Sequence, residues 1–306
     1  MTSVGGRRTR IRDEGKPTDP PVLLLHGIGR SLEDWSLQFS RLSESHRVIS
    51  LDLPGSGFSA RAAAPTTLEV LAQGVLDTLD AIGERRPVHV VGNSLGGAVA
   101  MQLSVLEPER VAGLVLVNSA GFGQEAALPL RLLAVPILGE MMGWRTTRTS
   151  ARIAERLSFA DPRLATEARV DHALAITQQP DTGTVVLETA RALATFRGSK
   201  AEWRMGLLTA VAPLRHPTLI IWGDRDRILP AHHLDAARRA LPYAETELFA
   251  GIGHMPQIEC PDKFAARVLA FFETVEGTAD FARSDVSETR QPRRRRTSAA
   301  RKAESR

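Results

Sequence analysis

One serine of this chain lies in a pattern that would suit a nucleophile. Ser94 is the central residue of Gly-Asn-Ser-Leu-Gly at positions 92–96, which matches the pattern G-x-S-x-G. An apolar, strand-like run at 88–91 precedes it and a helix-like stretch at 95–107 follows, so we expect the serine on a sharp strand-to-helix turn. The two glycines of the pattern would let the flanking chains approach closely. This context favours a nucleophilic Ser94 over a tight turn with an incidental serine.

A serine hydroxyl becomes a nucleophile when a neighbouring base takes its proton, and a carboxylate orients that base. His254 is the best candidate for the base among the eight histidines, because it follows the last strand-like run in a glycine-containing loop. Asp224 and Asp226 both follow the strand-like run that ends at Trp222, and either is a candidate for the orienting acid. Asn118, which follows the preceding run, carries no charge and cannot fill that role.

Several other residues have plainer interpretations. His89 lies in a strand-like run and should be packed there, whereas His232 and His233 lie on a predicted helix and should face solvent. Cys260 is the single cysteine, so no intramolecular disulfide can form, and we expect a packing residue rather than a catalytic thiol. No metal-ligand spacing, dinucleotide fingerprint or phosphate loop is recognisable, so we expect neither a metal nor a cofactor.

Strand-like and helix-like stretches alternate along most of the chain. The strand-like runs lie at 22–25, 48–51, 88–91, 114–117, 218–222 and 246–249, with an edge strand at about 9–12. The helix-like stretches lie at about 32–44, 67–84, 95–107, 231–241 and 262–275. This alternation predicts an α/β fold with a mostly parallel twisted sheet flanked by helices. Residues 122–212 break the alternation, and a stretch of that length suits an inserted helical lid better than a connecting loop.

Four motifs, taken with their order and spacing, resemble those of the α/β-hydrolase superfamily. They are His26-Gly27-Ile28-Gly29, Asp52-Leu53-Pro54-Gly55-Ser56-Gly57-Phe58-Ser59, Gly92-Asn93-Ser94-Leu95-Gly96-Gly97 and Trp222-Gly223-Asp224-Arg225-Asp226. The resemblance extends over about residues 9–275. It implies the α/β-hydrolase fold, with a core formed by 9–121 and 213–276 and a helical lid insertion at 122–212.

The resemblance also implies roles for individual residues. Ser94 resembles the nucleophile and His254 the base, while Asp226 rather than Asp224 resembles the catalytic acid. The backbone N–H groups of Leu95 and Ile28 would form the oxyanion hole that stabilises the negative charge of a tetrahedral intermediate. The histidine of the His-Gly turn at 26–27 would order its loop.

The net charge of +4 is concentrated at the two ends of the chain. Residues 277–306 carry +5 and residues 1–20 carry +2, which leaves −3 on the remainder. Since 277–306 is poor in apolar residues, we predict a disordered basic tail that solubilises the protein. Weak, non-specific contacts of this tail with nucleic acid or anionic lipid are the alternative. Without a secretory signal or an apolar stretch of about 20 residues, we expect no transmembrane segment and a cytoplasmic location.

The predicted lid supplies the only sequence indication of the substrate. It is apolar around 128–138, which favours a small to medium hydrophobic carboxylic ester cleaved through an acyl-enzyme intermediate. A carbon–carbon bond hydrolase of the meta-cleavage-product type is the alternative, since Gly-Asn-Ser at 92–94 also occurs in that family. Its usual Gly-Pro-Gly and the tryptophan after the histidine are replaced here by Ile28-Gly29-Arg30 and Met255. A slow-turnover ligand receptor on the same fold, or a binding protein led by the basic tail, also remains open.

Overall fold

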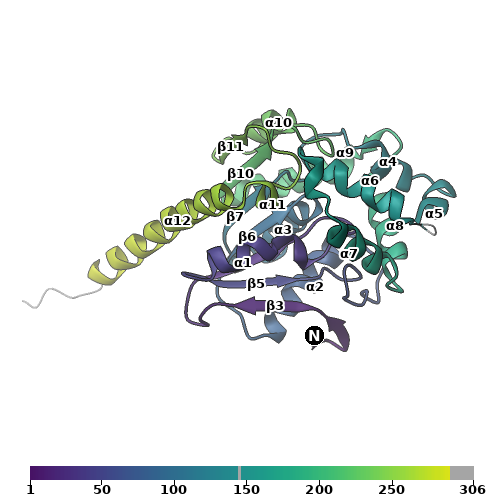
Figure 1. Cartoon of the computed structure of the whole chain (residues 1–306). Helices are drawn as coiled ribbons and strands as arrows, with labels where there is room; N and C mark the ends of the chain where they lie inside the picture. The colour runs from purple at the N-terminus through teal and green to yellow at the C-terminus, as the bar shows by residue number, and fades with distance from the viewer. Residues whose placement is uncertain (144–145, 290–306) are drawn as a thin grey trace, which may run out of the picture.

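A seven-stranded sheet forms the centre of the molecule (Figure 1). The computed structural model describes residues 1–143 and 146–289. In order across the sheet, the strands are β11 (Glu245–Phe249), β10 (Thr218–Gly223), β7 (Val111–Val117), β6 (Val88–Asn93), β4 (Pro21–Leu25), β5 (Arg47–Leu51) and β3 (Ile11–Glu14). Neighbouring strands are parallel except for β3, which pairs antiparallel with β5 at the edge. The predicted fold class is confirmed.

The apolar runs predicted as strands are buried because helices cover both faces of the sheet. Along β4, Leu23 and Leu25 enter one core cluster, whereas Val22 and Leu24 enter the other, as the alternation of a strand requires. The first cluster is covered by α2 (Leu68–Ala81), α3 (Leu95–Leu106) and α10 (His233–Ala240). The second is covered by α1 (Ser36–Leu42), which follows the short 3-10 helix η1 (Leu32–Trp35), and by α12 (Pro261–Thr289).

The N-terminal edge differs slightly from the prediction. The sequence suggests an edge strand at about 9–12, and the structure has it at β3, while β2 (Arg7–Thr9) pairs with β1 (Thr2–Val4) in a separate hairpin. Gly5 and Gly6 form the hairpin turn with φ of 53° and 80°, a region that glycine adopts without steric cost.

A run of helices occupies the interval between β7 and β10 that the sequence could not assign to the sheet. It contains α4 (Leu128–Leu133), α5 (Leu138–Gly143), α6 (Arg148–Ser158), α7 (Glu167–Thr177) and α8 (Thr182–Leu193) (Figure 1). A small hairpin of β8 (Ala194–Thr195) and β9 (Gly198–Ser199) follows, and then α9 (Ala201–Val211). Leu207 and Val211 of α9 are buried in the core cluster with α3, so α9 belongs to the core although the predicted insertion extends to residue 212.

The last helix is longer than the sequence suggests. The backbone of α12 is helical through Thr289 and extends away from the body in Figure 1, whereas disorder is predicted from residue 277. Residues 277–289 extend an existing helix, which needs no new nucleus, and they contain no proline. The rest of the predicted tail, 290–306, lies outside the described residues. No helix within the described part of the chain has the length and apolarity to cross a bilayer.

Candidate active site

Ser94 lies at the turn between β6 and α3, as predicted. Its φ of 56° and ψ of −117° are strained for a residue with a side chain, and such strain concentrates at functional sites. The N–H of Ser94 donates to the carbonyl of Val117 at 3.0 Å, which holds the turn against β7. A Cβ at Gly96 would lie 2.2 Å from the carbonyl oxygen of Leu25, and one at Gly92 would lie 2.2 Å from that of Gly96. Both glycines are therefore sterically required.

Asp226 and His254 form a buried pair beside this turn. The Nδ1 of His254 lies 2.7 Å from Oδ2 of Asp226, and both side chains are almost fully shielded from solvent. Since a carboxylate only accepts hydrogen bonds, the proton of this contact lies on Nδ1, which leaves Nε2 as the basic nitrogen. Oδ1 of Asp226 accepts the N–H groups of Ile228 at 2.7 Å and Leu229 at 3.0 Å. The carboxylate is thus held in one orientation.

Two asparagines that sequence reasoning did not use complete this arrangement. Asn118 follows β7 with φ of 44° and donates from Nδ2 to Oδ2 of Asp226 at 2.7 Å. Asn93 donates from Nδ2 to the carbonyl oxygens of Val117 at 3.1 Å and His254 at 3.0 Å. Asn93 therefore joins the serine turn to the histidine loop. Both asparagines stand at the ends of adjacent parallel strands, and this position is the sequence signal that could have identified them.

The remaining acid candidate, Asp224, has a different place. Its Oδ1 accepts the N–H of Gly251 at 2.7 Å, which braces the turn after β11 and leaves Asp224 exposed and separate from the histidine. Glu259 holds the loop that carries His254, because its carboxylate accepts the N–H groups of Gly253 at 2.9 Å and Met255 at 3.3 Å. Burial raises the pKa of Glu259, while these backbone donors oppose that shift.

The His-Gly turn after β4 packs directly against the serine. A Cβ at Gly27 would lie 3.4 Å from Cβ of Ser94, and Ile28 lines the same cavity as Ser94. The backbone N–H groups of Ile28 and Leu95 have no hydrogen-bond acceptor among the described residues, and Leu95 is the first residue of α3. Free N–H groups at a helix start and in a neighbouring turn suit a developing negative charge.

His26 and Asp52 order the loops around this turn rather than face the cavity. His26 is fully buried, with Nδ1 2.8 Å from the carbonyl oxygen of Gly27 and Nε2 accepting the N–H of Leu53 at 3.0 Å. Asp52 accepts the N–H groups of Leu32 and Phe58, each at 2.8 Å. These bonds explain why the two motifs at 26–29 and 52–59 occur together.

A cavity of about 440 Å³ opens over Ser94, His254 and Met255. The helical segment supplies most of its walls, through α4, α6, α7 and α8, with apolar side chains such as Leu130, Ile153 and Val186. Arg30 and Glu155 are the only permanently charged side chains among the lining residues that the structure describes, and they form an ion pair with each other. The cavity is therefore mostly apolar, and the polar side chains of its helical walls are uncharged hydroxyl groups apart from Glu155.

Four charges, two of them buried and two partly buried, connect the core to the helices that line this cavity. Arg30 contacts Asp34 through two bonds of 2.8 Å and also contacts Glu155 of α6. Arg169 of α7 donates to Glu155 and Asp34, both at 3.0 Å. Burial would lower the pKa of Arg30, but Asp34 and Glu155 outweigh it and raise that pKa. Because each charge faces two opposite charges, the network holds α6 and α7 against the core loop at 30–34.

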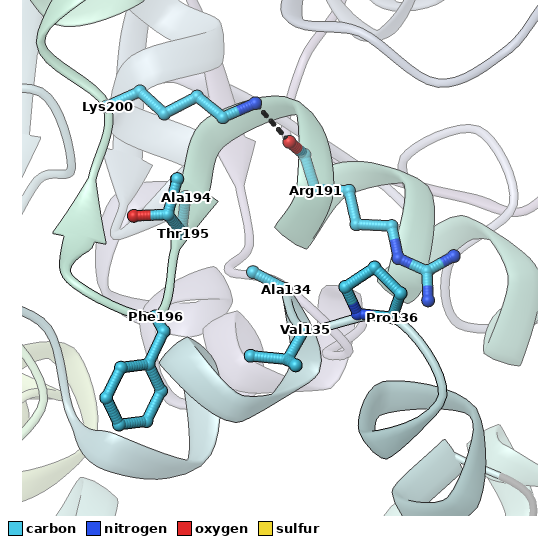
Figure 2. A pocket seen from close by; sticks show the side chains of 8 residues that line it. All are labelled: Ala134, Val135, Pro136, Arg191, Ala194, Thr195, Phe196 and Lys200. Carbon is cyan, nitrogen blue, oxygen red and sulfur yellow. Dashed lines mark hydrogen bonds between the residues drawn. The ribbon is translucent and has the colours of Figure 1, made fainter.

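A second cavity, of about 420 Å³, lies elsewhere on the helical segment (Figure 2). It is lined by residues of 134–136 and 191–200, including Phe196 and Lys200, whose Nζ donates to the carbonyl oxygen of Arg191. None of the candidate site residues lines it. Although the two cavities are similar in volume, only the one over Ser94 is lined by candidate site residues, among them Ser94 and His254.

Comparison with known proteins agrees with this arrangement. Residues 20–261 match the family model described as alpha/beta hydrolase fold. The dihydrolipoyllysine-residue acetyltransferase component of the acetoin cleaving system of Pseudomonas putida is 32% identical over 88% of this chain and 67% of that protein. The 2-hydroxymuconate semialdehyde hydrolase of Pseudomonas sp. (strain CF600) is 30% identical over 90% of this chain and 94% of that protein.

Solved structures show the same likeness. A meta-cleavage product hydrolase from Pseudomonas fluorescens IP01 superposes with a TM-score of 0.74 at 26% identity, covering 89% of this chain and 97% of that one. The family model spans most of the chain, and the relatives with assigned activities include hydrolases. Together with the serine turn between β6 and α3, these matches show that the chain belongs to the α/β-hydrolase family.

Proposed function

We propose that this chain is a serine hydrolase that cleaves small to medium hydrophobic carboxylic esters through an acyl-enzyme intermediate. The observation that carries the proposal is the Asp226–His254 pair, held in one orientation beside a strained Ser94 at the base of an apolar cavity. In this proposal Ser94 is the nucleophile, His254 the general base and Asp226 the acid that orients it. The backbone N–H groups of Leu95 and Ile28 form the oxyanion hole.

The reaction follows from the hydrogen bonds of the resting site. Nε2 of His254 takes the proton of Ser94 as its Oγ attacks the ester carbonyl, and Asp226 stabilises the imidazolium that results. The carbonyl oxygen becomes negative and accepts the N–H groups of Leu95 and Ile28. His254 then gives its proton to the leaving alcohol, which departs and leaves the acyl group on Ser94. Water, deprotonated by His254, releases the acid and restores the serine.

The cavity favours a neutral substrate. Its walls are mostly aliphatic, and Arg30 is already neutralised by Asp34 and Glu155, so the described lining offers no free cation for a substrate carboxylate. A charged substrate would leave its charge unpaired in apolar surroundings, at a cost of several kcal/mol. An uncharged acyl chain instead gains about 0.8 kcal/mol for each methylene that it buries.

The helices α4–α8 act as a lid in this proposal. Residues of α4, α6, α7 and α8 line the cavity, and Glu155 and Arg169 attach α6 and α7 to the core loop that carries Arg30 and Asp34. The lid then ends near residue 200 rather than 212, because α9 packs into the core. Substrate length should be set by α4, α6 and α8, whose side chains line the cavity but do not belong to the strand ends that carry the proposed triad.

A carbon–carbon bond hydrolase of the meta-cleavage-product type is the second candidate. The relative at 30% identity and the structure at 26% identity are both named for such reactions, and they favour it. The neutral lining of the cavity favours the ester, since the 2-hydroxymuconate semialdehyde named for that relative is an acidic compound. A receptor with slow turnover would bind a ligand in the same cavity.

One experiment separates these functions. The purified chain is labelled with a fluorophosphonate and the modified residue is identified by mass spectrometry, then p-nitrophenyl esters of two to twelve carbons and a ring-fission dienoate are assayed. We expect labelling at Ser94, an optimum among short to medium esters and no labelling of Ser94→Ala. Ser119→Ala is the matched control, since its hydroxyl bonds the carbonyl oxygen of Ala120.

Each contrary result is informative. Labelling of Ser94→Ala at the wild-type rate would refute the nucleophile. Faster turnover of the dienoate than of every ester would favour the second candidate. Ester turnover far below about 1 per second, the lower end of ordinary enzymes, together with tight ligand binding would indicate a receptor.

A further inference from the structure

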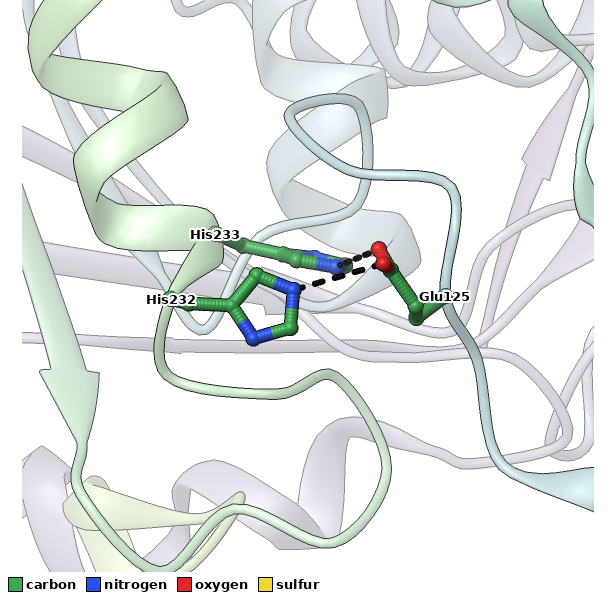
Figure 3. Close-up of side chains that lie close together, drawn as sticks. All are labelled: Glu125, His232 and His233. Atoms are coloured by element: carbon green, nitrogen blue, oxygen red, sulfur yellow. Dashed lines mark hydrogen bonds and ion pairs between the residues drawn. The ribbon is translucent and has the colours of Figure 1, made fainter.

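Three side chains that the reaction does not use converge where the lid meets the core (Figure 3). Glu125 lies in the segment that leads from β7 into α4, and His232 and His233 lie at the start of α10. Nε2 of His233 is 2.9 Å from Oε2 of Glu125, and Nε2 of His232 is 3.5 Å from Oε1. All three possible ligand atoms lie within 4.8 Å of one another. We call these residues the Glu125 cluster.

The inner histidine of this cluster is fixed by packing. His233 is only 1% exposed, which overturns the prediction that it faces solvent, and its ring meets the edge of the Trp222 ring at a centroid distance of 6.0 Å. The chain opposite leaves room for it only because residue 123 is glycine, since a Cβ there would lie 2.1 Å from Nε2 of His233. The imidazole nitrogen is therefore held in one place and aimed at Glu125.

The outer side of the cluster is open. The side chains of His232 and Glu125 are 61% and 58% exposed. Two imidazole nitrogens and one carboxylate on one side, with water on the other, resemble the open sites in which zinc has three protein ligands and a fourth position for water. Imidazole favours Zn²⁺ and its neighbours among the transition metals, whereas Mg²⁺ and Ca²⁺ prefer oxygen ligands.

The cluster also joins segments that are distant in sequence. Gln124 accepts the N–H of Ser199 at its carbonyl oxygen at 2.8 Å, so the two ends of the lid meet beside Glu125. Two residues after Glu125, the N–H of Ala127 donates to the carbonyl oxygen of Ile228 at 2.9 Å. The N–H of Ile228 in turn binds Asp226. A cation held by the cluster would therefore cross-link the base of the lid to the segment that carries the acid.

We propose that Glu125, His232 and His233 form a binding site for a divalent transition-metal ion, with Zn²⁺ preferred, that clamps the base of the lid to the start of α10. The sequence could not indicate this site, because Glu125 and His233 are 108 positions apart and only the fold brings them together. The metal lies outside the cavity over Ser94 and takes no part in the reaction there. The site is therefore independent of the proposed esterase function.

The test uses the full chain without an affinity tag, because a histidine tag would itself bind the metal. The protein is treated with EDTA, dialysed and titrated with Co²⁺, whose visible absorption reports coordination by nitrogen and oxygen, and then Zn²⁺ is added in competition. We expect one equivalent of Co²⁺ to bind and to be displaced by Zn²⁺. Glu125→Gln and His232→Ala should each weaken binding at least tenfold, and thermal unfolding should show a Zn²⁺-dependent rise in Tm that both variants lose.

The controls address folding and non-specific binding. Both variants alter exposed side chains and keep His233 against Trp222, so their Tm in EDTA should stay near the wild-type value. Glu44→Gln, at an exposed carboxylate on the surface, is the matched control and should bind as the wild type does. Binding that survives both substitutions, equal weakening by Glu44→Gln, or no binding by the wild type would each overturn the proposal.

Discussion

Replacing Asp226 by asparagine separates the charge of the acid from its hydrogen bonds. The carboxylate accepts four N–H groups, two at Oδ1 from Ile228 and Leu229 and two at Oδ2 from His254 and Asn118. In the Asp226→Asn variant the amide oxygen can remain at the Oδ1 position and keep both backbone donors. The amide nitrogen then faces His254 and Asn118, and both of these groups can change from donor to acceptor.

Two properties of these partners make that exchange possible. His254 can move its proton from Nδ1 to Nε2, and Asn118 can rotate its amide, since its Oδ1 has no partner among the described residues. The new amide then pairs with all four of its neighbours, but the rotated Asn118 gives up its bond to the carbonyl oxygen of Gly253, so we expect the free energy of unfolding to fall by only about 1–2 kcal/mol. The new tautomer, however, carries its proton on the nitrogen that faces the serine and cannot act as a base. By analogy with the same change in trypsin-like enzymes, kcat should fall about 10,000-fold.

Asp226→Ala provides the contrast. It removes the acceptor from Ile228, Leu229, Asn118 and His254; because His254 can move its proton to Nε2, three donors lose their partner at Asp226. At about 1–3 kcal/mol for each, unfolding should become easier by about 3–9 kcal/mol. Both variants therefore lose activity, but only the alanine variant loses most of its stability.

The assay combines p-nitrophenyl butyrate turnover with guanidinium unfolding of the three proteins at pH 7.5. A nitrogen-15 spectrum of the histidines in Asp226→Asn should show the proton on Nε2 of His254. More than a tenth of the wild-type kcat in this variant would show that Asp226 is not the acid. If Asp226→Asn and Asp226→Ala were equally destabilised, His254 and Asn118 would not have changed from donors to acceptors in the asparagine variant.

Three further predictions concern the frame around the site. Gly96→Ala should prevent folding or cost at least about 3 kcal/mol in chemical unfolding, because its Cβ would lie 2.2 Å from the carbonyl oxygen of Leu25; a stable, active variant would contradict the packing of the turn. Glu155→Gln leaves Arg30 with less compensating charge and should cost about 3–5 kcal/mol, seen as faster proteolysis within the lid; unchanged proteolysis would count against the charge network. Burial lowers the pKa of His46, so below pH of about 6.5 the unfolded chain takes up a proton that the folded chain resists, and stability is lost as the pH falls. His46→Gln should reduce the difference in Tm between pH 7.5 and 5.5, and an undiminished difference would argue against this histidine.

The sequence predicts the parts of the site that short segments encode. Ser94 is readable because G-x-S-x-G between an apolar run and a helix has one steric solution, and the clashes at Gly92 and Gly96 agree with it. Asp226 and His254 are readable because they follow the strands β10 and β11, which lie side by side at one edge of the sheet. Local pattern and parallel order together bring these three residues to one place.

Contacts between distant segments are less visible in the sequence. Asn118 has no charge, and only the pairing of β7 with β10 brings its amide to Asp226. His233 is expected to be exposed because its helix is polar, but in the fold its ring packs against Trp222 and the glycine at 123. The length of α12 is misjudged for a related reason, since burial of the first part of a helix stabilises the part that extends beyond it.

The residues that the sequence predicts and those that it does not predict belong to different parts of the fold. The proposed nucleophile, base and acid follow the ends of strands, where hydrogen-bond register fixes their spacing regardless of what surrounds them. The cavity walls come from α4, α6, α7 and α8, and no sheet pairing fixes the positions of these helices. They are attached to the core by the ion pairs among Arg30, Asp34 and Glu155. Substitutions on the lid can therefore change the size and polarity of the acyl pocket without moving the reacting atoms. Substrate choice on this scaffold should consequently follow the lid side chains, while the reaction type follows the strand ends.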